Sequence, residues 1–125
     1  MLGDPPLVKL ANMVLLSALA KGAQTIAIRR DTAEECVVMF SIAGASHEEL
    51  RPPLSLLGPL VRRLSVLANL PSYLKGQGAT GFIHLIIGSD REAWFAIRVE
   101  GHGDGLTARL RILGPHEVPP GPTPV

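Results

Sequence analysis

The sequence predicts an α+β fold with the element order α-β-β-β-α-β-β-β. Two segments carry apolar residues at helical spacing. Six shorter runs are predicted to be strands, and the run over residues 36–42 is rich in residues that favour strands. Turns containing glycine or proline separate most of these runs. At 125 residues the chain has the length of one domain, and we expect that domain to span residues 1–114.

The first helix is predicted from about Pro5 to Lys21. Asp4 and the prolines after it are typical of a helix start, because a carboxylate accepts from free amides and proline needs no partner in the first turn. Lys21 and Gly22 are typical of a helix end. The segment also resembles a signal peptide, but Asp4 and Asn12 argue against that interpretation. We therefore expect it to be a helix of the folded domain.

The second helix is predicted from about Gly58 to Asn69, preceded by an approach turn, because Pro59 is compatible only with a first helical turn. Residues 76–81 are expected to be a glycine-rich connector. The five prolines after Gly114 predict a flexible tail over residues 115–125. Strands are predicted at 25–28, 36–42, 46–50, 82–87, 93–99 and 106–113. The expected core includes Leu10, Val14, Phe40, Leu64, Leu67 and Ile97.

Composition excludes several classes of function. The net charge of +1 and the 4% of aromatic residues argue against a nucleic-acid-binding protein. No apolar run reaches the roughly 18 to 20 residues that span a bilayer, so we expect no membrane insertion. The single cysteine, Cys36, cannot form an internal disulfide, which favours a reducing, cytoplasmic compartment. The four histidines lack metal-site spacing.

No motif supplies catalytic chemistry. Residues 76–81 match G-x-G-x-x-G, but a dinucleotide site requires this loop to open a helix, and here a predicted strand follows it. The sequence contains no G-x-x-x-x-G-K-[ST] phosphate loop, and no set of residues supplies a nucleophile, a base and an orienting group. Residues 101–105 could offer backbone amides to an anion, although a hairpin turn is favoured. We expect no enzyme activity and no cofactor.

The arginines are the better candidates for a binding surface. Arg98 and Arg111 belong to strands that we expect to be neighbours, and Arg109 lies on the same strand as Arg111. A group of guanidinium groups on one face could bind carboxylates or phosphates. The alternative is that these are ordinary solvated strand positions.

Several short motifs together resemble the type II secretion and type IV pilus assembly ATPases. The resemblance is to the second N-terminal domain of those proteins, just before the motor domain, and it covers residues 6–113. It implies a PAS-like antiparallel sheet covered by helices. The motifs that carry it, in order, are Leu7–Asn12, Gly22-Ala23, Phe40–Gly44, Pro52-Pro53 and Arg63–Leu70.

The departures from the family pattern bear on function. The family's Ser-Asp-Ile-His-Ile-Glu-Pro segment is replaced here by residues 24–30, where its acidic position is basic. The final arginine of the family's Arg-Leu-Pro-Gln-Asp-Gly-Arg segment corresponds to Phe82. Arg98-Val99 retains the start of Arg-Val-Ser-Thr. In the motors, arginines of this domain reach nucleotide bound to the motor domain, and only Arg98 matches such a position.

The sequence therefore predicts a non-catalytic interaction or regulatory domain that acts by contact with a protein. The partner suggested by the resemblance is a secretion or pilus motor ATPase, and the residues expected at the interface are Arg98, Phe82, Arg63 and Arg111. Two alternatives stay open. One is a PAS-like sensor of a small ligand, and the other is a self-assembling scaffold, so a homo-oligomer is compatible with the sequence.

Overall fold

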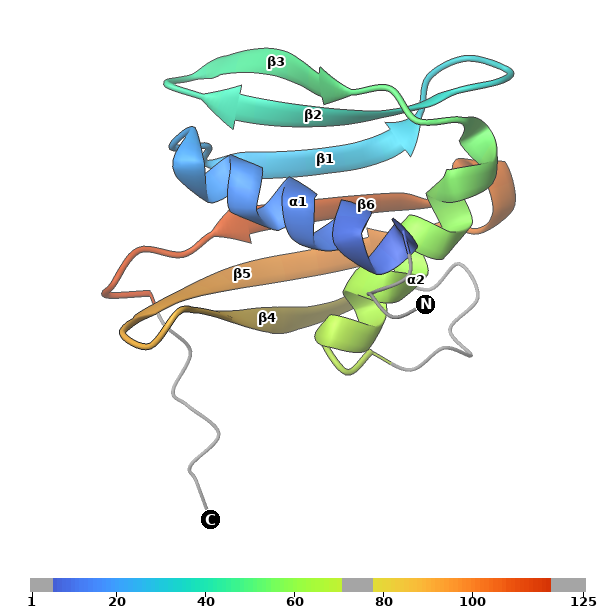
Figure 1. Ribbon diagram of the computed structural model, residues 1–125. Coiled ribbons are helices and arrows are strands. Elements are labelled where there is room, and N and C mark those ends of the chain that lie inside the picture. The colour runs from blue at the N-terminus through green and yellow to red at the C-terminus, as the bar shows by residue number, and fades with distance from the viewer. Residues whose placement is uncertain (1–5, 71–77, 118–125) are drawn as a thin grey trace.

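A computed structural model describes residues 6–70 and 78–117, which form a six-stranded antiparallel sheet with two α-helices on one face (Figure 1). The predicted α+β class and the order α-β-β-β-α-β-β-β are confirmed. No helix within these ranges is long and apolar enough to cross a membrane. The elements are α1 (Pro6–Ala20), β1 (Thr25–Arg30), β2 (Cys36–Ile42), β3 (Ala45–Leu50), α2 (Leu57–Leu67), β4 (Ala79–Ile87), β5 (Arg91–Glu100) and β6 (Thr107–Ile112).

The order of the strands brings the two halves of the chain together at the centre of the sheet. The order is β3-β2-β1-β6-β5-β4, so the first and last strands in sequence are central neighbours. Ile26 pairs with Leu110 and Ile28 with Ala108 across that junction. Helix α2 carries the chain from one edge strand, β3, to the other, β4 (Figure 1).

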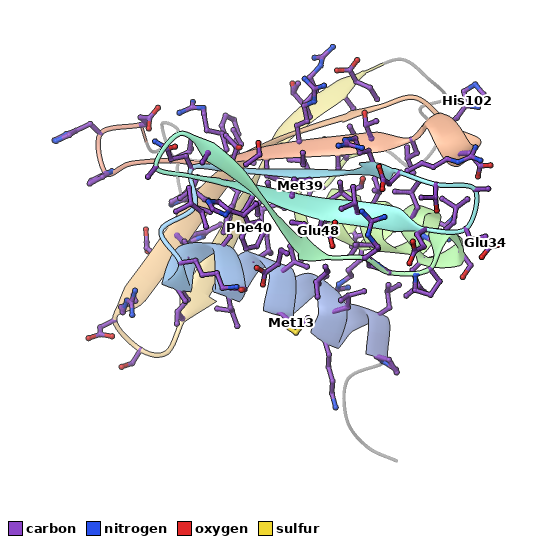
Figure 2. All side chains as sticks on the ribbon, turned by 90° about the horizontal axis from the view of Figure 1, so that it is seen from above. Met13, Glu34, Met39, Phe40, Glu48 and His102 are labelled. Carbon is purple, nitrogen blue, oxygen red and sulfur yellow. The ribbon has the colours of Figure 1, made fainter. Side chains whose placement is uncertain are left out.

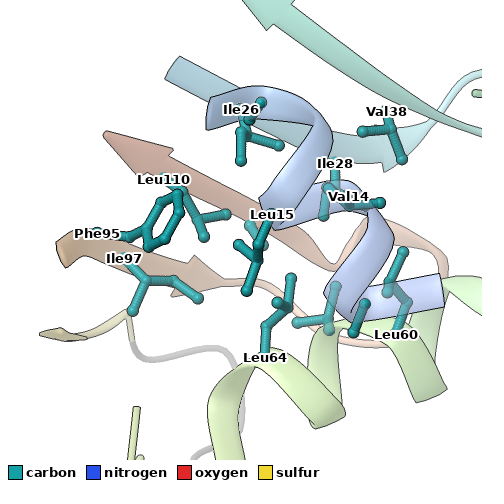
Figure 3. Packing of buried hydrophobic residues seen from close by; sticks show 14 of the residues in the cluster. Val14, Leu15, Ile26, Ile28, Val38, Leu60, Leu64, Phe95, Ile97 and Leu110 are labelled. Carbon is teal, nitrogen blue, oxygen red and sulfur yellow. The ribbon is translucent and has the colours of Figure 1, made fainter. Parts of the chain in front are cut away.

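The core lies between the sheet and the two helices. Figure 3 shows Val14 and Leu15 of α1 and Leu64 of α2 directed toward side chains of the central strands. Among the expected core residues, Val14, Phe40, Leu64 and Ile97 are at most 2% exposed, which confirms their assignment. Leu10 and Leu67 are only partly buried and pack against the cluster from its margin.

Several predicted boundaries need correction, because backbone pairing extends the strands past their apolar residues. Strand β4 begins at Ala79, inside the expected connector, and Thr80 pairs with Arg98. Strand β1 continues to Arg30, which pairs with Cys36. Helix α2 begins at Leu57 after a 3₁₀ turn over Leu54–Leu56, so the expected approach turn is confirmed. The predicted start of the first helix at Asp4-Pro5, the connector residues 76–77 and residues 118–125 of the predicted tail lie outside the described residues.

A polar contact joins α1 to edge strand β3. The Glu49 carboxylate accepts hydrogen bonds from Lys21 Nζ at 2.6 Å and from Ser17 Oγ at 2.7 Å. Lys21 and, to a smaller extent, Ser17 hold the pKa of Glu49 below its ordinary value of 4.5. The contact therefore fastens the C-terminal end of α1 to the sheet at the margin of the apolar core.

Replacing Leu64 should destabilise the fold strongly. Its side chain is fully buried between α2 and the sheet, so Leu64→Ala should lower the free energy of unfolding by about 2 to 5 kcal/mol. Val66 on the same helix is 56% exposed, and Val66→Ala should cost below about 0.5 kcal/mol. Urea unfolding of both variants measures the difference. Equal losses would mean that α2 is not packed as described.

Acid should weaken the link between α1 and β3. A carboxylate with a lowered folded-state pKa contributes stability above its unfolded pKa, and that contribution is lost as the pH falls through the folded value. The loss should therefore occur below about pH 4.5. We expect Glu49→Gln to lose less stability than the wild type between about pH 6 and about pH 3 in urea unfolding. Lys21→Met should show the same shallower dependence, and a wild-type slope in both variants would contradict this role.

Candidate functional site

The face of the sheet opposite the helices carries the candidate site. Side chains alternate between the two faces along a strand. Ile26, Phe95, Ile97 and Leu110 point toward the helices and are buried. Their neighbours in sequence, which include the arginines of β5 and β6, therefore point away from the helices. This second face, called the open face below, has neither α1 nor α2 on it (Figure 1).

A hollow of about 590 Å³ lies on the open face. The register places two rows of side chains across it. One row runs from Phe82 through Ala96 and Arg111 to Thr25, and the next runs from Thr80 through Arg98 and Arg109 to Ala27. The small residues in these rows leave room between the long ones. The hollow thus has a floor of small side chains and backbone, with arginines and Phe82 standing around it.

Three arginines surround this hollow, and two of them are paired with carboxylates. Arg98 and Arg109 are directly opposite on β5 and β6, an arrangement that is unfavourable without anions. Arg98 pairs with Glu100 and Arg111 with Glu117. No ion pair involving Arg109 is present within residues 6–70 and 78–117. Since the carboxylates lie at the margin, the arrangement is suited to an added anionic group.

The structure brings together three of the four predicted interface residues. Arg98, Arg111 and Phe82 all line the hollow, and the Phe82 side chain is 47% exposed. Arg63 is instead on α2, which covers the opposite face. Its side chain is partly buried, and its Nε has no hydrogen-bond partner among the described residues. Arg63 therefore does not belong to the open-face site.

A stacked pair of rings at the margin of the open face was missed from the sequence. His84 of β4 and Trp94 of β5 are cross-strand partners, and their rings stack with centroids 4.1 Å apart and planes 6° apart. The Trp94 Nε1 donates to Glu92 at 3.4 Å. The only available signal was the single tryptophan of the chain in a predicted strand, and its cross-strand partner depends on the register.

Arg51 forms ion pairs with carboxylates of the chain itself. Arg51, just after β3, donates to Asp31 at 2.6 Å and to Glu48 at 2.7 Å. Arg51 holds the pKa of Asp31 below its ordinary value, chiefly through this hydrogen bond. This cluster fixes the end of the β2–β3 hairpin, and its guanidinium is occupied by carboxylates of the chain itself.

The structure describes residues 78–81 of the first glycine-rich segment and all of the second. Gly78 leads directly into strand β4, so the strand expected after the connector is confirmed. The turn at residues 101–105 is a tight connection between β5 and β6, as favoured from the sequence. Gly101 has φ +77°, and a Cβ there would lie 2.2 Å from the Gly105 carbonyl oxygen. The Gly105 amide is occupied by the His102 carbonyl.

No cluster of metal-ligating side chains is found in the part of the chain that the structure describes. Cys36 is buried, and burial raises the pKa of its thiol, so this thiol is poorly suited to reaction with solvent species.

Comparison with known proteins identifies the relatives of this domain. The chain is 31% identical over 110 residues to the type IV pilus assembly ATPase PilB of Myxococcus xanthus. It is 32% identical over 109 residues to the type II secretion system ATPase E of Vibrio cholerae. These matches cover 88% and 86% of the chain. The chain is homologous to the N-terminal portion of these ATPases.

The resemblance inferred from the short motifs is thereby confirmed. The chain matches only 19% and 21% of the length of these two relatives. Among solved structures, the chain is similar to the Legionella pneumophila ATPase DotB, with a TM-score of 0.61 and 16% sequence identity. The match covers 90% of this chain and 32% of the DotB chain. That likeness supports the fold. No protein-family model matches the chain.

We predict that the isolated chain does not bind ATP tightly. It contains no phosphate loop, and the family resemblance implies that Phe82 replaces an arginine. Titration calorimetry of the 125-residue chain with ATP and Mg²⁺ should give a dissociation constant weaker than about 1 mM. A micromolar constant that is lost in Arg98→Ala would contradict the prediction and would assign nucleotide binding to the open face.

Proposed function

We propose that this chain is a non-catalytic interaction domain that regulates a partner by protein–protein contact through the open face of its sheet. The observation that carries the proposal is the convergence of Arg98, Arg109, Arg111 and Phe82 around one hollow. Guanidinium groups and aromatic rings are both enriched at the centres of protein interfaces. A surface that combines them is suited to a protein partner with exposed carboxylates.

The chemistry of the hollow specifies the kind of contact. A guanidinium can hold a carboxylate with two parallel hydrogen bonds, which gives both strength and orientation. The cross-strand positions of Arg98 and Arg109 are suited to one acidic side chain between them. Phe82 adds apolar area at the margin, where a partner side chain can pack against it.

The homology suggests the partner. The relatives that share this domain are ATPases of type IV pilus assembly and type II secretion. We therefore propose that the domain contacts a motor ATPase of this kind and modulates it. The retained Arg98 and the phenylalanine at position 82 favour contact with protein over contact with nucleotide.

A sensor of an internal ligand has less support. The space between the sheet and the helices is filled by the apolar cluster, and no buried polar or charged residue occurs among the described positions. The hollow lies on the outer side of the sheet. An internal PAS-like site would need both a cavity and polar groups to recognise its ligand.

The proposal is tested by a binding titration with the secretion or pilus ATPase recovered from the source cell. Arg98→Ala should weaken binding by about 1 kcal/mol or more, about fivefold, and should leave the thermal unfolding midpoint nearly unchanged, because the Arg98 side chain is half exposed. The matched control is Arg62→Ala, an exposed arginine on α2, which should bind as the wild type does.

Two outcomes would count against the proposal. If Arg98→Ala unfolds markedly earlier than the wild type, Arg98 is a structural residue. If Arg98→Ala and the control bind equally well, the interface lies elsewhere and the retained arginine has no role in it.

A further inference from the structure

The two edges of the sheet differ in their protection against pairing. Edge strand β3 carries Glu48 and Glu49 (Glu48 is labelled in Figure 2), and its register with β2 shifts at Val38/Met39. Charges and bulges of this kind prevent a strand edge from pairing with another chain. The opposite edge strand, β4, has the sequence ATGFIHLII. It contains no proline and no acidic or basic residue other than His84.

Strand β4 is also long and regular. All nine of its residues pair with β5 in one uninterrupted register, and it has no other strand partner among the described residues. A long, straight and apolar edge of this kind is a template for adding another strand.

The direction of the free backbone groups follows from one hydrogen bond. The Leu113 N–H donates to the Trp94 carbonyl at 2.9 Å, so the backbone groups of Trp94 point toward β6. Successive residues of an antiparallel strand point these groups to alternate sides. Phe95 therefore points toward β4, where it pairs with Ile83.

Ile83 thus uses its backbone groups within the sheet. By the same alternation, the N–H and C=O groups of Phe82, His84 and Ile86 point outward from the edge of the sheet. The same three residues direct their side chains to the open face.

We propose that a second copy of this chain pairs with the free edge of β4, antiparallel and centred on His84. This register brings Phe82 of each copy opposite Ile86 of the other. Phe82 is 47% exposed and Ile86 is 68% exposed, so each copy covers the two apolar side chains that β4 leaves in water. Pairs of aromatic and β-branched side chains stabilise antiparallel strands.

The segment is therefore complementary to itself. Each hydrogen-bonded pair of residues in such a ladder exchanges two backbone bonds. The strands that carry Arg98, Arg109 and Arg111 lie inside each sheet, so the pairing covers Phe82 at the margin of the hollow and leaves these arginines uncovered. A two-fold axis perpendicular to the sheet places both open faces on the same side. The dimer would then present two arginine-lined hollows to one partner, which strengthens binding by avidity.

The first test is the oligomeric state of the full chain by analytical ultracentrifugation. An interface made of one pair of strands is at the small end of specific interfaces. Its dissociation constant should be on the order of 1 to 100 µM. Ile86→Lys places a charge on the seam and should weaken the dimer at least tenfold. The matched control, Val66→Lys, changes an aliphatic residue on α2 that is 56% exposed, and it should dimerise as the wild type does. A wild type that stays monomeric over this range, or a dimer unaffected by Ile86→Lys, overturns the proposal.

The second test is independent of any substitution. Amide hydrogen exchange of the wild type should show protection at Phe82, His84 and Ile86 that rises with protein concentration. The amides of Ile83 and Leu85, which face β5, should be protected at every concentration and serve as internal controls. A dimer in which the three outward amides exchange freely at high concentration would be formed through another surface, and that result also overturns the proposal.

Discussion

The pairing of β1 with β6 is the contact on which the rest of the structure depends. It joins the first and last strands at the centre of the sheet. The three-stranded halves β3-β2-β1 and β6-β5-β4 thereby form one continuous sheet. Ile26, Ile28 and Leu110 from this junction lie in the apolar core beneath the helices. Since side chains alternate, the same pairing directs Ala27, Arg109 and Arg111 to the open face. The core and the candidate site are thus two faces of one ladder.

Under the proposed function, one face of the sheet provides stability and the other provides recognition. The helix-covered face is apolar. The hydrogen bonds of Glu49 with Ser17 and Lys21 lie at the margin of this face. On the open face, three guanidinium groups surround a hollow lined by small residues, and two of them are paired with carboxylates. Substitutions on the open face would change the proposed binding surface without creating a cavity in the core, so they can alter recognition while the fold is retained.

The edge of the sheet adds a third surface. Strand β3 carries charges and an irregular register, while β4 carries neither. That asymmetry matters physically because an unpaired strand edge is a row of hydrogen-bond donors and acceptors in need of partners. The apolar side chains of Phe82 and Ile86 lie on the same strand as these groups. Backbone pairing and apolar burial would therefore occur together in a single contact, and the arginine-lined hollow would remain open beside it.

The sequence by itself determined the order of the elements, the apolar stripes of the two helices and the homology, because these depend on local periodicity and on ordered motifs. Val14 belongs to the stripe of α1 and Leu64 to the stripe of α2. The sequence also indicated that Arg98 and Arg111 lie on neighbouring strands. Only the tertiary structure decided that Arg109 stands opposite Arg98, that Trp94 stacks on His84, and that Arg63 lies on the other side of the sheet. These relations depend on register and strand order, and a shift of one residue moves every side chain to the opposite face. Local propensity carries no information about that choice.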